Sequence, residues 1–88
     1  NDLITENQFA VFPNPTSGSI TVTFNSDVSA NGTIVIYNTL SELVYSKEIN
    51  ISEGVNEQVI DLVNEVKGIY FLQFKYSTGT YNMKIVKN

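Results

Sequence analysis

Apolar and polar residues alternate along most of this chain, which is the pattern of β-strands with one buried face. The clearest case is residues 20–24, where Ile20, Val22 and Phe24 alternate with two threonines. Similar segments follow one another, separated by Gly, Pro, Asn, Asp and Ser. The pattern predicts strands at residues 9–12, 20–24, 33–37, 42–49, 55–62, 68–76 and 81–87.

The last two predicted strands carry the strongest apolar signal. Residues 69–76 are mostly β-branched, aromatic or Leu, which is typical of a central strand in a two-layer protein. Gly68 opens this strand, and its missing Cβ lets the chain turn sharply or approach a neighbour closely. In the final strand Lys84 lies on the face opposite the apolar side chains, and a turn at residues 76–80 joins the two strands as a hairpin.

Turn signals separate the strands. Pro13 and Pro15 keep their preceding residues extended, Asn14 can begin a turn, and Gly18 can adopt a positive φ. Further turn signals predict loops at 25–32, where Asn31-Gly32 is a strong hairpin signal, and at 38–41 and 51–54. Residues 63–67 are expected to form one helical turn or an irregular crossover.

Seven short strands separated by turns predict an all-β fold, a seven-stranded antiparallel immunoglobulin-like β-sandwich, with a barrel as the alternative. The Cys and Trp hallmarks of antibody domains are absent. At 88 residues the chain forms one domain with one thin core. We expect residues 1–8 to be a polar linker tail and residues 9–88 to be the folded domain.

Composition excludes several classes of function. The net charge is −4 and there is no Arg, so the chain lacks the basic footprint that nucleic acids or anionic membranes require. No apolar run approaches the roughly 20 residues of a spanning helix, so no membrane insertion is expected. No Cys is present, and the chain is therefore silent about redox compartment. The sequence begins at Asn1 without a leader, which suggests a fragment of a longer protein; if that protein is exported, its leader lies upstream.

Candidate catalytic and ligand sites are weak. With no His and no Cys, the commonest general base, the thiol nucleophile and the usual zinc ligands are missing. We therefore expect no enzyme, no metal and no cofactor. Glu57 and Asp61, with Glu53 nearby, share a strand face and are more typical of a solvated surface than of an acid/base pair.

Two weak binding signals remain. Asn25, Asp27 and Asn31 offer oxygen atoms to Ca²⁺ but lack a recognisable ligand spacing, so a plain polar loop is favoured. Tyrosines form sugar-binding platforms in some sandwich modules, but tyrosine is also a preferred strand residue. The five tyrosines are Tyr37, Tyr45, Tyr70, Tyr76 and Tyr81.

Three motifs stand in a fixed order along the chain. The first is Phe12-Pro13-Asn14-Pro15-Thr16-Ser17-Gly18, the second is Gly68-Ile69-Tyr70-Phe71-Leu72, and the third is Lys84-Ile85-Val86-Lys87. With this order and spacing, the chain resembles the type A C-terminal sorting domain of the type IX (Por) secretion system of Bacteroidetes. The resemblance covers nearly the whole chain, from residue 9 to residue 88.

One turn departs from the family's pattern. Sorting domains often carry Asp-x-x-Gly between the middle strands, where this chain has Asn38-Thr39-Leu40-Ser41. Asn38 can replace Asp as a turn former, but Ser41 adopts a positive φ less readily than Gly does. The departure puts the local turn type in doubt rather than the family.

The resemblance implies a secretion signal rather than a catalyst. Its partners would be the type IX translocon, a sortase-like peptidase and an N-terminal passenger domain, and the product would reach the cell surface or the medium via the periplasm. A cut would fall near residues 1–8 or upstream. We expect recognition at the terminal hairpin, through Gly68, Tyr70, Lys84 and Lys87, although Gly68 and Tyr70 are as readily explained as core-building residues.

The first motif is expected to set the fold rather than to touch a partner, through Pro13, Asn14, Pro15 and Gly18. A different class of function stays open at this point. The alternative is an accessory immunoglobulin-like module that binds carbohydrate or protein in adhesion. The two functions differ in one respect that is visible in a sequence, because a sorting domain must end its polypeptide whereas a binding module can lie anywhere in it.

Overall fold

The computed structural model describes residues 9–77 and 79–88, and within these ranges the chain forms seven β-strands and no helix. This confirms the all-β prediction. The predicted linker tail at residues 1–8 lies outside the described residues. The strands are β1 (Ala10–Phe12), β2 (Ser19–Ser26), β3 (Ala30–Asn38), β4 (Leu43–Ile51), β5 (Gly54–Asp61), β6 (Gly68–Tyr76) and β7 (Gly79–Lys87).

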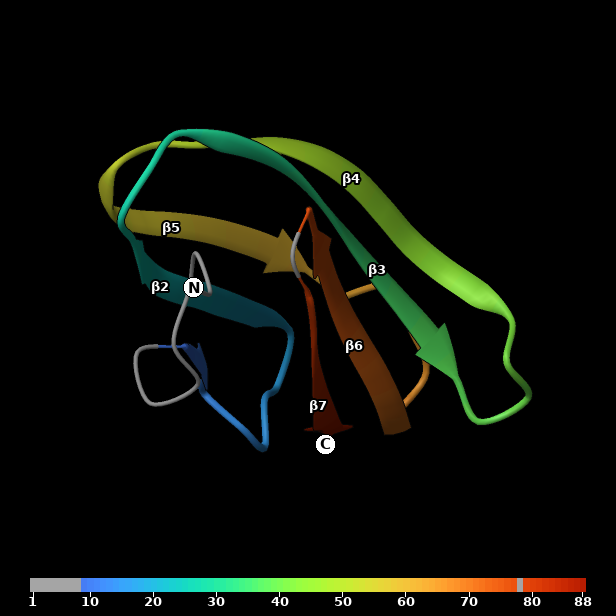
Figure 1. The fold of residues 1–88 in the computed structure, drawn as a ribbon. Coiled ribbons are helices and arrows are strands. Elements are labelled where there is room, and N and C mark those ends of the chain that lie inside the picture. The colour runs from blue at the N-terminus through green and yellow to red at the C-terminus, as the bar shows by residue number, and fades with distance from the viewer. Residues whose placement is uncertain (1–8, 78) are drawn as a thin grey trace.

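The strands form two antiparallel sheets, with the order β1-β2-β5 in one and β4-β3-β6-β7 in the other. Figure 1 shows the two layers, with β2 and β5 in one and β3, β4, β6 and β7 in the other. Two separate sheets establish the sandwich rather than the barrel. β4 pairs with β3 here, whereas in an antibody constant domain the fourth strand joins the sheet of the first, second and fifth strands.

The core lies between the sheets and follows from the alternation in the sequence. Ile20, Val22 and Phe24 of β2 are buried, while the threonines between them face outward. Phe24 meets Phe74 of β6 across the core, with ring centroids 4.9 Å apart. The buried apolar cluster consists of Phe9, Ile20, Val22, Phe24, Ile34, Ile36, Ile49, Ile51, Ile60, Leu62, Tyr70, Leu72, Phe74 and Ile85.

The predicted turn at Asn31-Gly32 is wrong, because both residues lie inside β3. The chain instead turns at residues 27–29, where the Ser26 hydroxyl donates a hydrogen bond to the carbonyl of Val28 at 2.7 Å. Glycine is required at position 32 for close packing, since a Cβ there would lie 2.8 Å from the Phe74 ring. A close approach of two strands has the same sequence signature as a turn.

The turn between β3 and β4 forms where it was predicted. The Asn38 side-chain oxygen accepts hydrogen bonds from the backbone N–H groups of Leu40 and Glu42, both at 2.9 Å, so Asn38 does replace the family's aspartate. Ser41 adopts φ 65°, the left-handed conformation that favours glycine. Ser41 therefore takes the conformation for which a glycine would be suited.

Candidate recognition site

Segments far apart in the sequence meet at one end of the sandwich, which we call the motif end. It is formed by three connections, residues 13–18, 39–42 and 62–67, and by the last residues of β7. Thr16 forms an isolated parallel bridge with Lys87, and Lys87 is also the register partner of Gly68. Figure 1 shows the blue connection between β1 and β2 at the same end of the molecule as the arrowhead of β7.

The first motif covers part of the open edge of β7. The Asn14 amide nitrogen donates to the carbonyl of Lys84 at 2.8 Å, and its oxygen accepts from the Val86 N–H at 3.0 Å. The Thr16 N–H donates to the Val86 carbonyl at 2.9 Å, and the Thr16 carbonyl accepts from the Asn88 N–H at 2.8 Å. Residues 14–16 therefore cover the end of the β7 edge through the Asn14 side chain and one backbone bridge at Thr16.

Pro13 and Pro15 flank this contact, and both are exposed. The Phe12–Pro13 and Asn14–Pro15 peptide bonds are cis. The two prolines therefore border Asn14, whose side chain bonds to the β7 backbone.

Tyr70 joins the second motif to the crossover between the sheets. Its ring is 2% exposed in the core, and its hydroxyl donates to the carbonyl of Val66, four residues upstream. This is the tyrosine corner of immunoglobulin-like sandwiches, at the start of the sixth strand. Burial raises the pKa of Tyr70 above its usual value of 10.0, and the nearby Glu65 carboxylate raises it further, so the hydroxyl stays protonated as the donor at neutral pH.

Lys87 and Lys84 of the third motif have different surroundings. The Lys87 side chain is 9% exposed, and its ammonium group donates to the carbonyl of Glu65 at 2.7 Å. This corrects the expectation that Lys87 presents its charge as an exposed edge residue, because the charge is used to hold the crossover. Lys84 is exposed on the outer face of the four-stranded sheet, opposite Phe71 of β6.

The two motif glycines also differ. Gly68 has φ 147°, and a Cβ there would meet no atom within 4 Å, so it serves the sharp turn into β6 rather than a close approach. Gly18 was expected to adopt a positive φ, and it does not. It is buried, and its carbonyl accepts a hydrogen bond from the Leu62 N–H at 3.0 Å, which extends the pairing of β2 with β5 at the motif end.

The candidate catalytic and metal sites do not assemble in the described part of the chain. Glu57 and Asp61 lie exposed on the outer face of β5, as the alternation predicted. The Asp61 carboxylate accepts a hydrogen bond from the Val63 N–H at 2.9 Å, which is a local turn contact. No group of three acidic, His or Cys side chains suited to a metal ion occurs among residues 9–77 and 79–88.

The three residues weighed as a weak calcium candidate are divided by the fold. Asn25 belongs to β2 and Asn31 to β3, so only Asp27 lies in the turn between them.

Within residues 9–77 and 79–88, no helix is long and apolar enough to cross a membrane.

The tyrosines do not form one platform. Tyr70 is in the core, whereas Tyr76 and Tyr81 stack on each other at the end opposite the motif end, with centroids 5.8 Å apart. Tyr81 also stacks on Phe9 at 5.0 Å. Tyr37 lies on the outer face of the four-stranded sheet, on the strand face opposite its core-facing neighbour Ile36. Rings this scattered do not present a common flat surface to a sugar.

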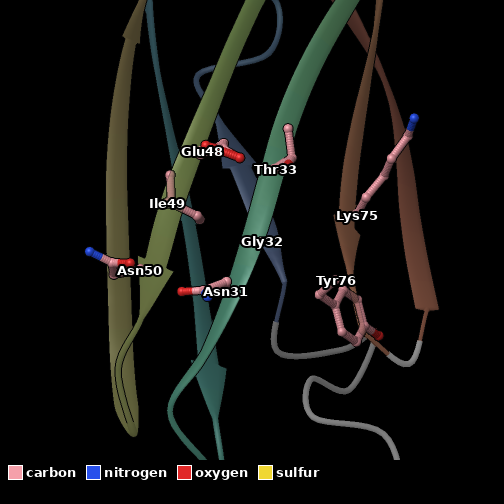
Figure 2. Close-up of a pocket in the computed structure, with 8 residues that line it drawn as sticks. All are labelled: Asn31, Gly32, Thr33, Glu48, Ile49, Asn50, Lys75 and Tyr76. Atoms are coloured by element: carbon pink, nitrogen blue, oxygen red, sulfur yellow. The ribbon is translucent and has the colours of Figure 1, made fainter.

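A shallow depression lies where β3, β4 and β6 meet, away from the motif end. Its lining residues are Asn31, Gly32, Thr33, Glu48, Ile49, Asn50, Lys75 and Tyr76. Figure 2 shows that the polar side chains do not converge. Lys75 points away from Glu48, and the side chains of Asn31 and Asn50 lie on the opposite side of β3 from Lys75. A ligand site needs a few convergent polar groups, so this depression is not the functional site.

The motif end is thus the part of the molecule where the residues of the three sequence motifs gather. The family described as "Secretion system C-terminal sorting domain" matches residues 10–88. The chain belongs to this family. It is a sorting signal of type IX secretion, which implies a passenger domain, contact with the secretion machinery, and export to the cell surface or the medium.

Other comparisons add little to the identity of the sorting domain. No curated protein sequence matches it. Among solved structures it is similar to a GH3 β-glucosidase of Bifidobacterium adolescentis, at 18% identity and a TM-score of 0.40. That match covers 93% of this chain and 16% of the glucosidase.

Sequence reasoning missed two residues of the sorting domain's motif end. Thr16 is 1% exposed, and its hydroxyl both donates to the Ser19 carbonyl at 2.7 Å and accepts from the Gly18 N–H at 3.0 Å. Glu65 contributes through its backbone carbonyl, which has no signature in a sequence. The position of Thr16 inside a turn motif was the only available signal, and it did not indicate burial.

Proposed function

We propose that this sorting domain directs its parent protein from the periplasm across the outer membrane through the type IX machinery, and that a sortase-like peptidase then removes it. The passenger would be attached to the surface or released. One observation carries this proposal: at one end of a small sandwich the first motif is hydrogen-bonded to the third, up to 72 residues away, and the third pairs with the second in the β6–β7 ladder. A folded tag can be read at such a surface without any chemistry of its own.

The recognised surface proposed is the motif end, shaped by Gly68 and Tyr70 and charged by Lys84. Lys87 contributes by fixing the crossover. Seven of the ten large apolar residues that are exposed in the described part of the chain lie at or near this end, and apolar exposure of this kind marks interaction sites. These seven are Phe12, Leu40, Leu43, Val63, Val66, Ile69 and Phe71.

The proposed cut lies upstream of Phe9. The Phe9 ring is buried, and it stacks on Tyr81 at 5.0 Å and on Phe74 at 5.9 Å. A peptidase needs an extended, accessible backbone, and Phe9 is packed into the core. Residues 1–8, or residues further upstream, are therefore the proposed substrate.

A sorting assay tests this function. Residues 1–88 would be fused behind an exported fluorescent passenger in a Bacteroidetes host with an intact type IX system. We expect the passenger at the surface or in the medium, and its loss from both in a translocon mutant. A passenger that stays in the periplasm while the domain is folded would contradict the proposal and favour the binding-module alternative.

A further inference from the structure

The edge of β7 is only partly covered. β7 is the last strand of its sheet, and the N–H and C=O groups of Val86 point away from β6, since they bond to residues 14 and 16. Strand backbones alternate in direction with a period of two, so the same groups of Lys84, Asn82 and Thr80 also point outward. The Lys84 carbonyl already accepts a hydrogen bond from the Asn14 side-chain amide. In the described part of the chain, the backbone of Thr80 and Asn82 and the N–H of Lys84 have no strand partner.

We propose that this open segment, residues 80–84, is a strand-addition site for an extended segment of a protein of the secretion machinery. The inference rests on the proposed function and names its mode of contact. The incoming segment would continue the order β4-β3-β6-β7 with a fifth strand, held by main-chain hydrogen bonds. Residues 14–16 would end the added pairing at Lys84, which limits the contact to a short and reversible one.

The neighbouring side chains indicate the chemistry of the incoming segment. Lys84 is exposed on the outer face, so an acidic residue opposite it would be favoured. Tyr81 and Met83 of β7 lie on the opposite face from Lys84 and are only partly buried against the core. An incoming segment with an acidic residue opposite Lys84 and apolar residues on its other face therefore matches this edge in both charge and hydrophobicity.

The other edges are less suitable for strand addition. β1 has three residues. β5 carries two exposed carboxylates, Glu57 and Asp61, and β4 carries Lys47 and Glu48 next to each other and has a register shift against β3. Several charges on one strand and irregular register protect edges from pairing, whereas residues 80–84 carry one charge, Lys84.

Asn82→Pro is the sharpest probe of this site. The Asn82 N–H points away from β6, so proline removes an outward donor and leaves the β6–β7 ladder intact, and proline is tolerated at such edge positions. Ser46→Pro is the matched control on the edge of β4. The Asn38 N–H donates to the Glu42 carbonyl, so the backbone N–H and C=O groups of the even-numbered β3 residues point toward β4. Their partners Tyr45 and Lys47 point their backbone groups back toward β3. Because the direction alternates along the strand, the backbone groups of Ser46 point away from the sheet.

The sorting assay, with thermal melts of each purified variant, gives the readout. We expect Asn82→Pro to reduce surface delivery by about tenfold, the effect of losing one main-chain hydrogen bond and adding a steric block. Ser46→Pro should deliver as the original sequence does. Equal delivery by a folded Asn82→Pro domain would overturn strand addition and leave the sorting function standing, whereas failure of the original sequence would overturn both.

Two further measurements keep the test decisive. If Asn82→Pro does not fold, Lys84→Glu replaces it, with Lys47→Glu on β4 as its control. Reduced surface delivery in Lys84→Glu alone would support the site, and unchanged delivery would overturn it.

The mass of the purified domain in solution tests whether a second copy of the domain is the occupant. A dimer that Asn82→Pro converts to a monomer would show that the edge pairs with itself, which would overturn the proposed partner.

Discussion

The hydrogen bonds of Asn14 to β7 can be removed without disturbing the core. Asn14→Ala deletes both the donor to the Lys84 carbonyl and the acceptor for the Val86 N–H, while the exposed position leaves room for water. The Thr16 contacts to Val86 and Asn88 stay in place. We therefore expect a local loosening of the β7 edge in a domain that is still folded.

The size of the effect follows from the two bonds. Each contributes about 0.5–1.5 kcal/mol net, and their exposure places them in the lower part of that range, because water replaces the lost partner. The free energy of unfolding should fall by about 1 to 2 kcal/mol, which corresponds to a decrease in Tm of roughly 5 to 10 °C for a domain of this length.

Amide hydrogen exchange would locate the change. In Asn14→Ala the Val86 amide should exchange about tenfold faster, whereas the amides of Ile85 and Lys87, which face β6, should change only by the loss of global stability. Asn50→Ala, an exposed asparagine on β4, is the matched control and should leave both stability and Val86 exchange unchanged. An unchanged Val86 amide in Asn14→Ala would refute the edge-covering role of residue 14.

Two further predictions follow from the turns and the corner. Ser41→Gly should raise the free energy of unfolding by about 0.5–1 kcal/mol in a denaturant titration, since φ 65° strains serine and not glycine; a loss of stability would contradict this. Tyr70→Phe should cost about 1 kcal/mol at pH 7 by losing the bond to the Val66 carbonyl. The pKa of Tyr70 is higher in the folded state than its usual value of 10.0, so its contribution to the free energy of unfolding is complete below pH 10.0 and is lost as the pH rises above that value. The stability of Tyr70→Phe should therefore decline less steeply at alkaline pH than that of the original sequence.

The sequence predicts the fold wherever one physical cause dominates. The alternation of apolar and polar residues is enough to predict β2, since Ile20, Val22 and Phe24 all lie on the buried face of that strand. The same reasoning fails at Asn31-Gly32, because a turn and a crowded strand both select glycine, and only the position of the Phe74 ring distinguishes them. It fails again at Lys87, where an apparent edge charge is buried against the Glu65 carbonyl.

The motif end could be anticipated only in outline. Because β1 runs parallel to β5, and β3 parallel to β7, the odd-numbered strands end at one end of the sandwich, so residues 12–18 and 84–88 are brought together by topology. Topology does not say which groups bond, since the partners of the Asn14 and Lys87 side chains are backbone N–H and C=O groups that almost any residue carries. The side chains that the sequence shows therefore supply one side of these contacts, and the other side is main chain. Under the proposed function, a signal built in this way would exist only when the first and last strands are both in place, so machinery that reads the motif end would also detect that the domain has folded.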